Sequence, residues 1–139
     1  MPARVETRGR SRALQALYAW DLREKQDLDR VAGLIWDDLA VALDERAFAG
    51  NLLRIVAADR EQLDAELADV TTNWRLERLG VIERCVLRLA AAELHEGVTP
   101  PRVVIQEAVR LAERFGSEQS AGFVNGVLDA LARRLGRLR

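Results

Sequence analysis

Residues from Val81 to about His95 can form a helix that is apolar on nearly every side, and this stretch constrains the fold most strongly. Its apolar residues recur at helical spacing, and they leave only a narrow polar strip. A helix with so little polar surface needs neighbours around it, as at the centre of a bundle. No segment alternates apolar and polar residues for long, as a half-buried strand would, and aromatic residues make up only 5% of the chain. The pattern therefore predicts an all-α protein.

Further helices are predicted before this central one. The first covers roughly residues 9–23 and the second about residues 28–43. The second is expected to turn an apolar face inward, made of Val31, Leu34, Ile35 and Leu39. Asp44 is the expected N-cap of a third helix, which is long enough for a bend or break. Trp74 is expected to begin a short helical turn.

Glycine and proline mark the ends of the last helices. Gly97 is expected to close the central helix as a left-handed cap, and Pro101 suits the first turn of the next. Gly116 should stop that helix, and Ser117 or Ser120 should cap the final one. We expect one domain over residues 1–139, with six or seven helices in two packed three-helix bundles.

The formal net charge of −1 conceals an uneven distribution of charge. Arginines gather in residues 4–12 and again in residues 133–139, whereas residues 26–46 are acidic. Arginine binds phosphate through two parallel hydrogen bonds and stacks on bases, so the pattern is consistent with a local basic surface. The alternative is the codon bias of a GC-rich genome combined with solvated, frayed termini.

The sequence offers no constellation of residues suited to catalysis. Cys85 is the single cysteine, so no internal disulfide is possible, and its apolar neighbours indicate a core position. His95 is the single histidine and lacks the second histidine of a helical zinc site. No glycine-rich phosphate loop is present. We therefore expect no catalytic residue, cofactor or metal, and no membrane association, in a soluble cytoplasmic protein.

Binding features remain at the first helix. Arg8, Arg10 and Arg12 are placed to contact phosphates or stack on bases. Arg8, Arg12 and Gln15 are expected to lie close together on the side opposite the apolar face, because spacings of four and three return to the same side of a helix. Tyr18 lies at the edge of that apolar face, where its amphipathic ring can meet either the core or a partner.

Two further positions lie near the end of the chain and in the central helix. Phe123 falls beside the apolar stripe of the final helix, where an exposed ring can stack on an unpaired base. The alternative is that Phe123 is an ordinary core residue. Glu83 lies on the polar strip of the central helix, where it can pair with Arg84, Arg88 or water.

Four blocks in this order resemble the NusB family of transcription antitermination factors. They are Arg8–Trp20 (RGRSRALQALYAW), Ile82–Leu89 (IERCVLRL), Pro101–Glu107 and Phe123–Asp129. The resemblance implies an all-helical fold of two three-helix bundles plus a short helix. It also implies binding to boxA-type single-stranded RNA of ribosomal RNA leaders jointly with NusE, a protein of the small ribosomal subunit. In that role the complex helps RNA polymerase read through terminators.

The resemblance also suggests which residues carry these contacts. Arg8, Arg10 and Arg12 would contact RNA through the basic start of the chain. Phe123 and the neighbouring Gln119 would form a second RNA-facing site. Two residues match positions that face NusE in the family, and these are Tyr18 and Glu83.

Two other functions compete with this one. A NusB-like domain also precedes the catalytic half of certain ribosomal RNA cytosine methyltransferases. In this sequence, which runs to Arg139, no Rossmann-like segment is found after the NusB-like blocks. The other is a purely structural helical homodimer, for which the arginines would have no role in binding. Neither a monomer nor a homodimer is favoured by the sequence.

Overall fold

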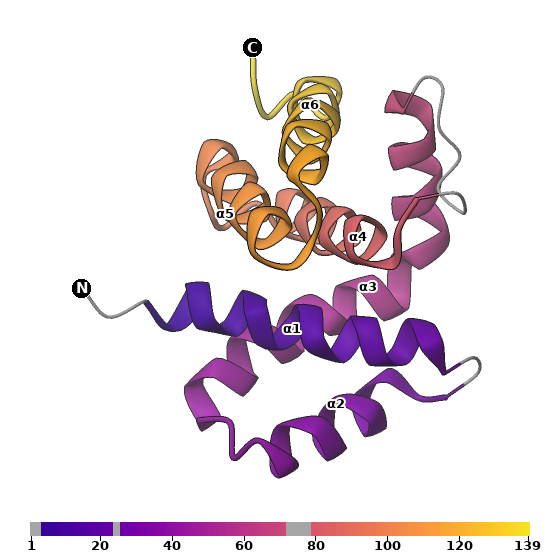
Figure 1. Cartoon of the computed structure of the whole chain (residues 1–139). Helices are drawn as coiled ribbons and strands as arrows, with labels where there is room; N and C mark the ends of the chain where they lie inside the picture. Colours follow the sequence, from indigo (N-terminus) through magenta and orange to yellow (C-terminus); the bar gives the residue numbers. More distant parts are fainter. Residues whose placement is uncertain (1–3, 24–25, 72–78) are drawn as a thin grey trace. The chain divides into compact units, whose positions relative to one another are not determined.

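The computed structural model describes residues 4–23, 26–71 and 79–139, and these residues contain six α-helices and no β-strand (Figure 1). The helices are α1 (Val5–Leu22), α2 (Leu28–Asp38), α3 (Leu43–Val70), α4 (Val81–Glu96), α5 (Pro101–Phe115) and α6 (Glu118–Arg134). The predicted all-α fold is therefore confirmed. The predicted helical turn at Trp74 lies outside the described residues. The chain divides into two compact units, Met1–Ala58 and Asp59–Arg139.

The first unit is built from α1, α2 and the first half of α3. Helices α1 and α2 pack against each other (Figure 1). Helices α1, α2 and α3 all contribute to the core, which includes Ala13, Leu14, Ala16, Leu17, Leu28, Val31, Ala32, Trp36, Leu52, Leu53 and Val56. The indole Nε1 of Trp36 donates a hydrogen bond to the carbonyl of Arg12 at 3.2 Å, which fixes α2 to α1.

Helix α2 is shorter than the sequence pattern predicted. It ends at Asp38 rather than near residue 43. Two residues predicted to face inward are exposed instead, with 58% of Leu34 and 47% of Leu39 accessible to solvent. The helix is rotated so that Leu28, Ala32 and Trp36, spaced four residues apart, are buried together with Val31. The prediction for Leu34 and Leu39 was therefore wrong.

A tight turn terminates α2. The N–H of Ala40 donates to the Asp37 carbonyl at 3.2 Å, and the N–H of Val41 donates to the Trp36 carbonyl at 2.9 Å. This pair of bonds defines a Schellman motif, whose central residue must be left-handed. Ala40 fills that position with φ of 51°, although glycine is the usual residue there. No glycine or proline marks this end of the helix, which explains why the predicted helix extended beyond Asp38.

Helix α3 begins at Leu43, one residue before the predicted N-cap Asp44, whose carboxylate accepts a hydrogen bond from the Glu45 N–H at 2.8 Å. Asp44 therefore lies within the first turn. At Asp59 the backbone departs from helical geometry, with φ of −118° and ψ of 21°. This interruption bears out the expected break, and it coincides with the boundary between the two units.

The second unit contains the remainder of α3 together with α4, α5 and α6. Helices α4, α5 and α6 pack against one another in all three pairs (Figure 1). Helix α4 is buried on most sides, as predicted, and Cys85 lies in the core. Arg88 is 4% exposed, and its guanidinium donates two hydrogen bonds of 2.8 and 2.9 Å to the carboxylate of Asp64 in α3.

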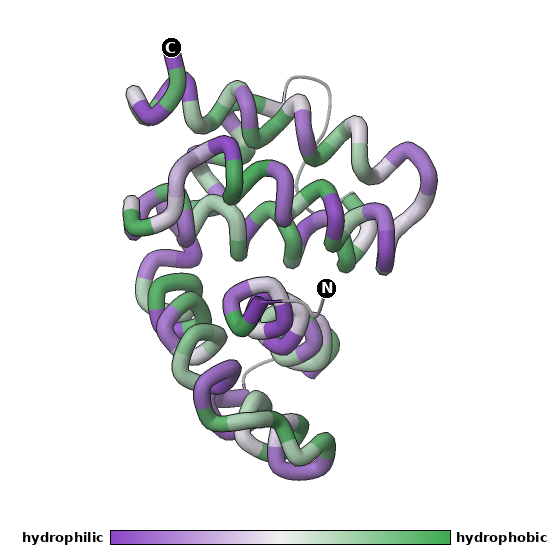
Figure 2. Tube along the Cα trace, turned by 90° about the vertical axis from the view of Figure 1, so that its left-hand side faces the viewer, coloured by the Kyte–Doolittle hydropathy of each residue, from purple (hydrophilic) through white to green (hydrophobic). Residues whose placement is uncertain are grey.

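The predicted ends of the last helices are confirmed. Gly97 caps α4 with a left-handed φ of 75°, and Pro101 begins α5. Gly116 ends α5, and Ser117 and Ser120 together form the capping box of α6. In Figure 2 hydrophobic and hydrophilic segments alternate along the helical traces, as expected when each helix buries one face. None of the described helices has both the length and the apolarity needed to cross a membrane.

Candidate nucleic-acid and protein interface

The arginines of α1 are organised by one carboxylate of α3. Arg8 Nε donates to Glu45 Oε2 at 3.1 Å, and Arg12 Nε donates to Glu45 Oε1 at 3.3 Å. The Glu45 side chain is 9% exposed, whereas those of Arg8 and Arg12 are 41% and 30% exposed. One carboxylate therefore positions both guanidinium groups. Arg12 also donates to Gln15 at 3.2 Å, which confirms that these two side chains lie together.

Arg10 is placed differently from the other two arginines. It is only 5% exposed, and its guanidinium carbon lies 5.1 Å from the centre of the Phe48 ring. This is the distance of a cation–π contact, which contributes more when it is shielded from water. The structure therefore gives Arg10 a packing role within the first unit. Of the three arginines predicted to bind RNA, Arg8 and Arg12 are the ones that solvent reaches.

Gly9 explains how Phe48 of α3 approaches α1 so closely. A Cβ atom at Gly9 would lie 2.7 Å from Cδ1 of Phe48 and 3.2 Å from its Cβ. The ring therefore occupies the space that a side chain at residue 9 would need. Phe48 lies against both Gly9 and the Arg10 guanidinium, and it fixes the start of α1 against α3. No local pattern in the sequence indicated that Phe48 and Glu45 would be the partners of these residues.

The other predicted residue of α1, Tyr18, is 41% exposed. Leu22 follows one turn later on the same side of the helix and is 59% exposed. Together they present an amphipathic ring and an aliphatic side chain to solvent. This agrees with the expectation that Tyr18 lies at the edge of the apolar face.

Three of the predicted residues meet around one hollow in the second unit. The hollow has a volume of about 210 Å³, and the residues that line it are Leu79, Gly80, Glu83, Ser117, Gln119, Ser120 and Phe123. Phe123 is half-buried and Gln119 is exposed. Of the two alternatives for Phe123, a partly exposed ring and an ordinary core residue, the structure shows the first. The structure brings the residues expected to bind RNA, Gln119 and Phe123, next to Glu83, which was expected to face a protein.

Glu83 has a defined partner at this hollow. Its carboxylate accepts a short hydrogen bond from the hydroxyl of Ser120. Ser120 Oγ also accepts from the Ser117 N–H at 2.9 Å and lies 3.0 Å from Ser117 Oγ. A carboxylate at this end of α6 is further favoured by the helix dipole. Ser117 and Ser120 were predicted from the sequence as alternative caps, but nothing local indicated Glu83, which is 37 residues away from Ser120.

Another polar contact joins two helices of the second unit. His95 Nε2 of α4 lies 2.7 Å from Glu66 Oε2 of α3, so the single histidine connects two helices of the second unit. Within the described part of the chain, no group of three or more histidine, cysteine or acidic residues is arranged to hold a metal ion.

These features define a class of protein: an all-helical protein whose exposed polar and aromatic groups suit the binding of RNA or of another protein. A family model described as the NusB family matches residues 7–133. The chain belongs to the NusB family.

Relatives and solved structures are similar over nearly the whole chain. The transcription antitermination protein NusB of Anaeromyxobacter dehalogenans (strain 2CP-1) is 43% identical over 127 residues, which cover 91% of this chain and 89% of the relative. The transcription antitermination protein NusB of Sorangium cellulosum is 43% identical over 131 residues, which cover 94% of this chain and 93% of the relative. A structure of T. maritima NusB has a TM-score of 0.86 and 33% identity, covering 96% of this chain and 93% of that one.

One solved structure contains partners. It is described as the antitermination factors NusB and NusE in complex with dsRNA, and the matched chain has a TM-score of 0.87 and 27% identity. The match covers 96% of this chain and 99% of that chain.

Proposed function

We propose that the protein is a transcription antitermination factor that acts in the cytoplasm. It binds boxA-type RNA of ribosomal RNA leaders together with NusE, and it helps RNA polymerase to read through terminators. The observation that carries this proposal is the likeness, over 96% of the chain, to a NusB that was solved with NusE and RNA. The proposed activity is one of binding, and it needs no catalytic residue.

The chain's own residues support an RNA-binding role for α1. Arg8 and Arg12 are fixed by Glu45, so each guanidinium is oriented before RNA arrives and less side-chain entropy is lost on binding. Arginine contacts to phosphate are sequence-independent, and they make the affinity depend on salt. We assign Arg10 to the support of this face, because it is buried against Phe48.

The hollow beside α6 supports a second contact with RNA. Phe123 offers part of an aromatic ring and Gln119 offers an exposed amide one turn away. Stacking on a ring is tolerant of sequence, whereas an amide can form hydrogen bonds with a base edge. This pairing of groups is suited to an unpaired base better than to one inside a duplex.

For the protein partner we assign Tyr18 as the residue that faces NusE. Its ring and the adjacent Leu22 present apolar surface with a polar tip, which is typical of interface residues. Glu83 is the second residue that we assign to the contact with NusE, and its carboxylate also accepts a hydrogen bond from Ser120. Tyr18→Asp should therefore impair the binding of NusE, which pull-down or calorimetry would measure, while RNA contacts by Arg8 and Arg12 remain.

The decisive experiment is fluorescence anisotropy of a labelled boxA-like RNA and of a scrambled control, with and without purified NusE, at near-physiological salt. We expect selective binding that NusE strengthens. Arg8→Ala and Arg12→Ala should each weaken it, whereas Arg54→Ala, which changes an exposed arginine of the same unit, should not. Light scattering on the same samples would give the oligomeric state.

Equal and weak binding to both RNAs, unchanged by NusE, would refute the proposal. Such a result would favour a structural helical homodimer. If boxA binds selectively but the arginine variants bind as well as wild type, the RNA-binding function would stand and the assignment to α1 would be wrong.

A further inference from the structure

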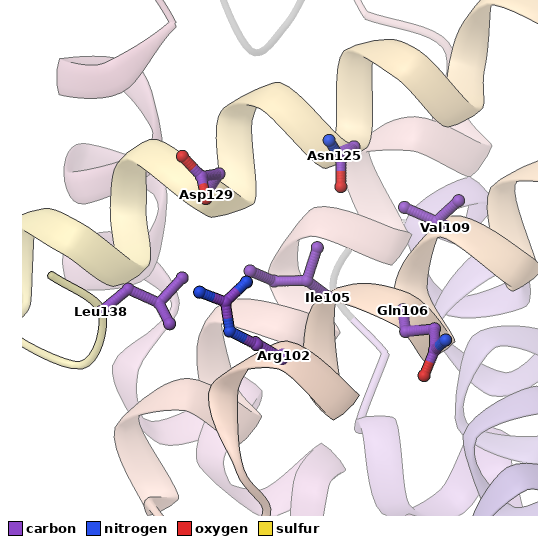
Figure 3. Close-up of a pocket in the computed structure, with 7 residues that line it drawn as sticks. All are labelled: Arg102, Ile105, Gln106, Val109, Asn125, Asp129 and Leu138. Atoms are coloured by element: carbon purple, nitrogen blue, oxygen red, sulfur yellow. The ribbon is translucent and has the colours of Figure 1, made fainter.

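A second groove lies on the opposite flank of α6 from Phe123. Helix α5 contributes Arg102, Ile105, Gln106 and Val109, α6 contributes Asn125 and Asp129, and the end of the chain contributes Leu138 (Figure 3). Its volume is about 310 Å³. Asn125 is two positions after Phe123, which corresponds to about 200° around a helix, so the groove is distinct from the hollow described above.

The groove is formed by regular local structure. The four residues of α5 are spaced by three, one and three, so they form one stripe along the helix. Beyond α6, Gly136 has a left-handed φ of 73°. The N–H groups of Arg137 and Leu138 then donate to the Ala132 carbonyl at 2.8 and 3.2 Å. This turn places Leu138 at one end of the groove.

The charges in the groove are not equivalent. Asp129 accepts hydrogen bonds of 2.9 and 3.4 Å from Arg133. This bond, together with the charges of Arg133 and Arg102, lowers the pKa of the Asp129 carboxyl below its usual value. Arg102 acts on Asp129 through charge and not through a hydrogen bond. In Figure 3 the Arg102 guanidinium points into the space between Leu138 and Ile105, where a ligand would meet it.

The lining combines three kinds of group. The aliphatic side chains of Ile105, Val109 and Leu138 provide an apolar surface. The side-chain amides of Gln106 and Asn125 can both donate and accept hydrogen bonds, as a peptide backbone requires. Arg102 can bind a carboxylate with two parallel hydrogen bonds. The negative charge of Asp129 would oppose an acidic ligand, but Arg133 offsets it.

We propose that this groove binds a short peptide segment of a partner protein, in which an aliphatic side chain lies next to a carboxylate. The aliphatic side chain would lie against Ile105 and Val109, and the carboxylate would bind Arg102. A nucleotide fits less well, because none of the seven lining residues is aromatic and a base would find no ring on which to stack. The inference goes beyond the proposed function, which makes no use of these residues.

The test is an NMR titration of the full-length ¹⁵N-labelled protein with N-acetyl-Leu-Asp-amide. N-acetyl-Leu-Asn-amide is the matched uncharged probe, and cytidine monophosphate is the nucleotide probe. We expect the aspartyl peptide to shift the resonances of Val109 and the side-chain amides of Gln106 and Asn125. It should bind at least about tenfold more tightly than the asparaginyl peptide, because a hydrogen bond to a charged group contributes more than a neutral one.

Arg102→Gln should remove the difference between the two peptides, whereas Arg110→Gln should preserve it. Arg110 is an exposed arginine of the same helix and does not line the groove. Three outcomes would overturn the proposal: equal affinity of the two peptides for the wild-type protein, no shift up to about 10 mM peptide, or shifts in the groove with the nucleotide alone. The comparison of the two peptides on the wild-type protein does not depend on any variant.

Discussion

Arg46 closes the turn between α2 and α3, and its replacement should reduce stability more than that of any exposed arginine in the same unit. Its Nε donates to the Val41 carbonyl at 2.9 Å and its Nη2 to the Trp36 carbonyl at 2.8 Å. Its Nη1 pairs with Asp37 at 2.6 Å. One guanidinium therefore binds two carbonyls and one carboxylate at the end of α2.

The expected magnitude follows from these bonds. The pair with Asp37 contributes little, about 0–1 kcal/mol, because the Asp37 side chain is 74% exposed. The two bonds to backbone carbonyls come from a charged donor and contribute about 1.5 kcal/mol each. The Trp36 carbonyl keeps its bond from the Val41 N–H, which moderates the loss. We expect Arg46→Ala to lower the free energy of unfolding of the first unit by about 2–4 kcal/mol.

Urea unfolding followed by tryptophan fluorescence would measure this loss, and hydrogen exchange at the Leu39 and Val41 amides would localise it. Arg46→Lys should recover less than half of the loss, since an ammonium group cannot reach all three acceptors in this geometry. Arg54→Ala is the control and should change the stability by less than about 0.5 kcal/mol. A similarly small change for Arg46→Ala, with unaltered exchange at Val41, would refute this reasoning.

Three further outcomes are expected. Ala40→Gly should raise the free energy of unfolding by about 0.5–1 kcal/mol in a thermal melt, because Ala40 has a φ of 51° that glycine adopts without strain; an unchanged melting temperature would count against this. Gly9→Ala should lower the free energy of unfolding by about 1–3 kcal/mol, because the new Cβ would lie 2.7 Å from Phe48. Gly33→Ala is the control: a Cβ there would have nothing within 4 Å, so this substitution should raise the free energy of unfolding by up to about 1 kcal/mol. Equal effects of the two substitutions would show that the contact with Phe48 is unimportant. Arg12→Ala should reduce the slope of log affinity for single-stranded RNA against log salt by about 0.7, as expected for one phosphate contact; an unchanged slope would remove Arg12 from the RNA surface.

The end of α4 and the start of α5 could be predicted from the sequence because the signals are local. Gly97 and Pro101 determine their own backbone geometry, and no distant residue is needed to interpret them. The end of α2 could not be predicted in this way. Ala40 carries no preference for a left-handed conformation, and the side-chain bonds that support the turn come from Arg46 in the next helix.

In the candidate site, too, local patterns were predictive, whereas contacts with residues distant in the sequence could not be predicted. Helical spacing correctly placed Arg12 beside Gln15 and put Tyr18 at a partly exposed edge. Spacing within α1 cannot indicate which of its arginines is covered by Phe48 of another helix, so Arg10 was expected at the surface. The contact between Glu83 and Ser120 is of the same kind, because it joins residues that only the folded chain brings together.

The interruption of α3 at Asp59 affects the local unfolding of the protein. The first half of α3 is fixed by contacts of Glu45 and Phe48 with α1, whereas the second half is fixed by contacts of Asp64 and Glu66 with α4. A continuous helix would propagate fraying from one unit into the other, since each turn is hydrogen-bonded to the next. A non-helical residue at the boundary limits that cooperativity. The two halves of one helix can then belong to separate folding units, each with its own protection against hydrogen exchange.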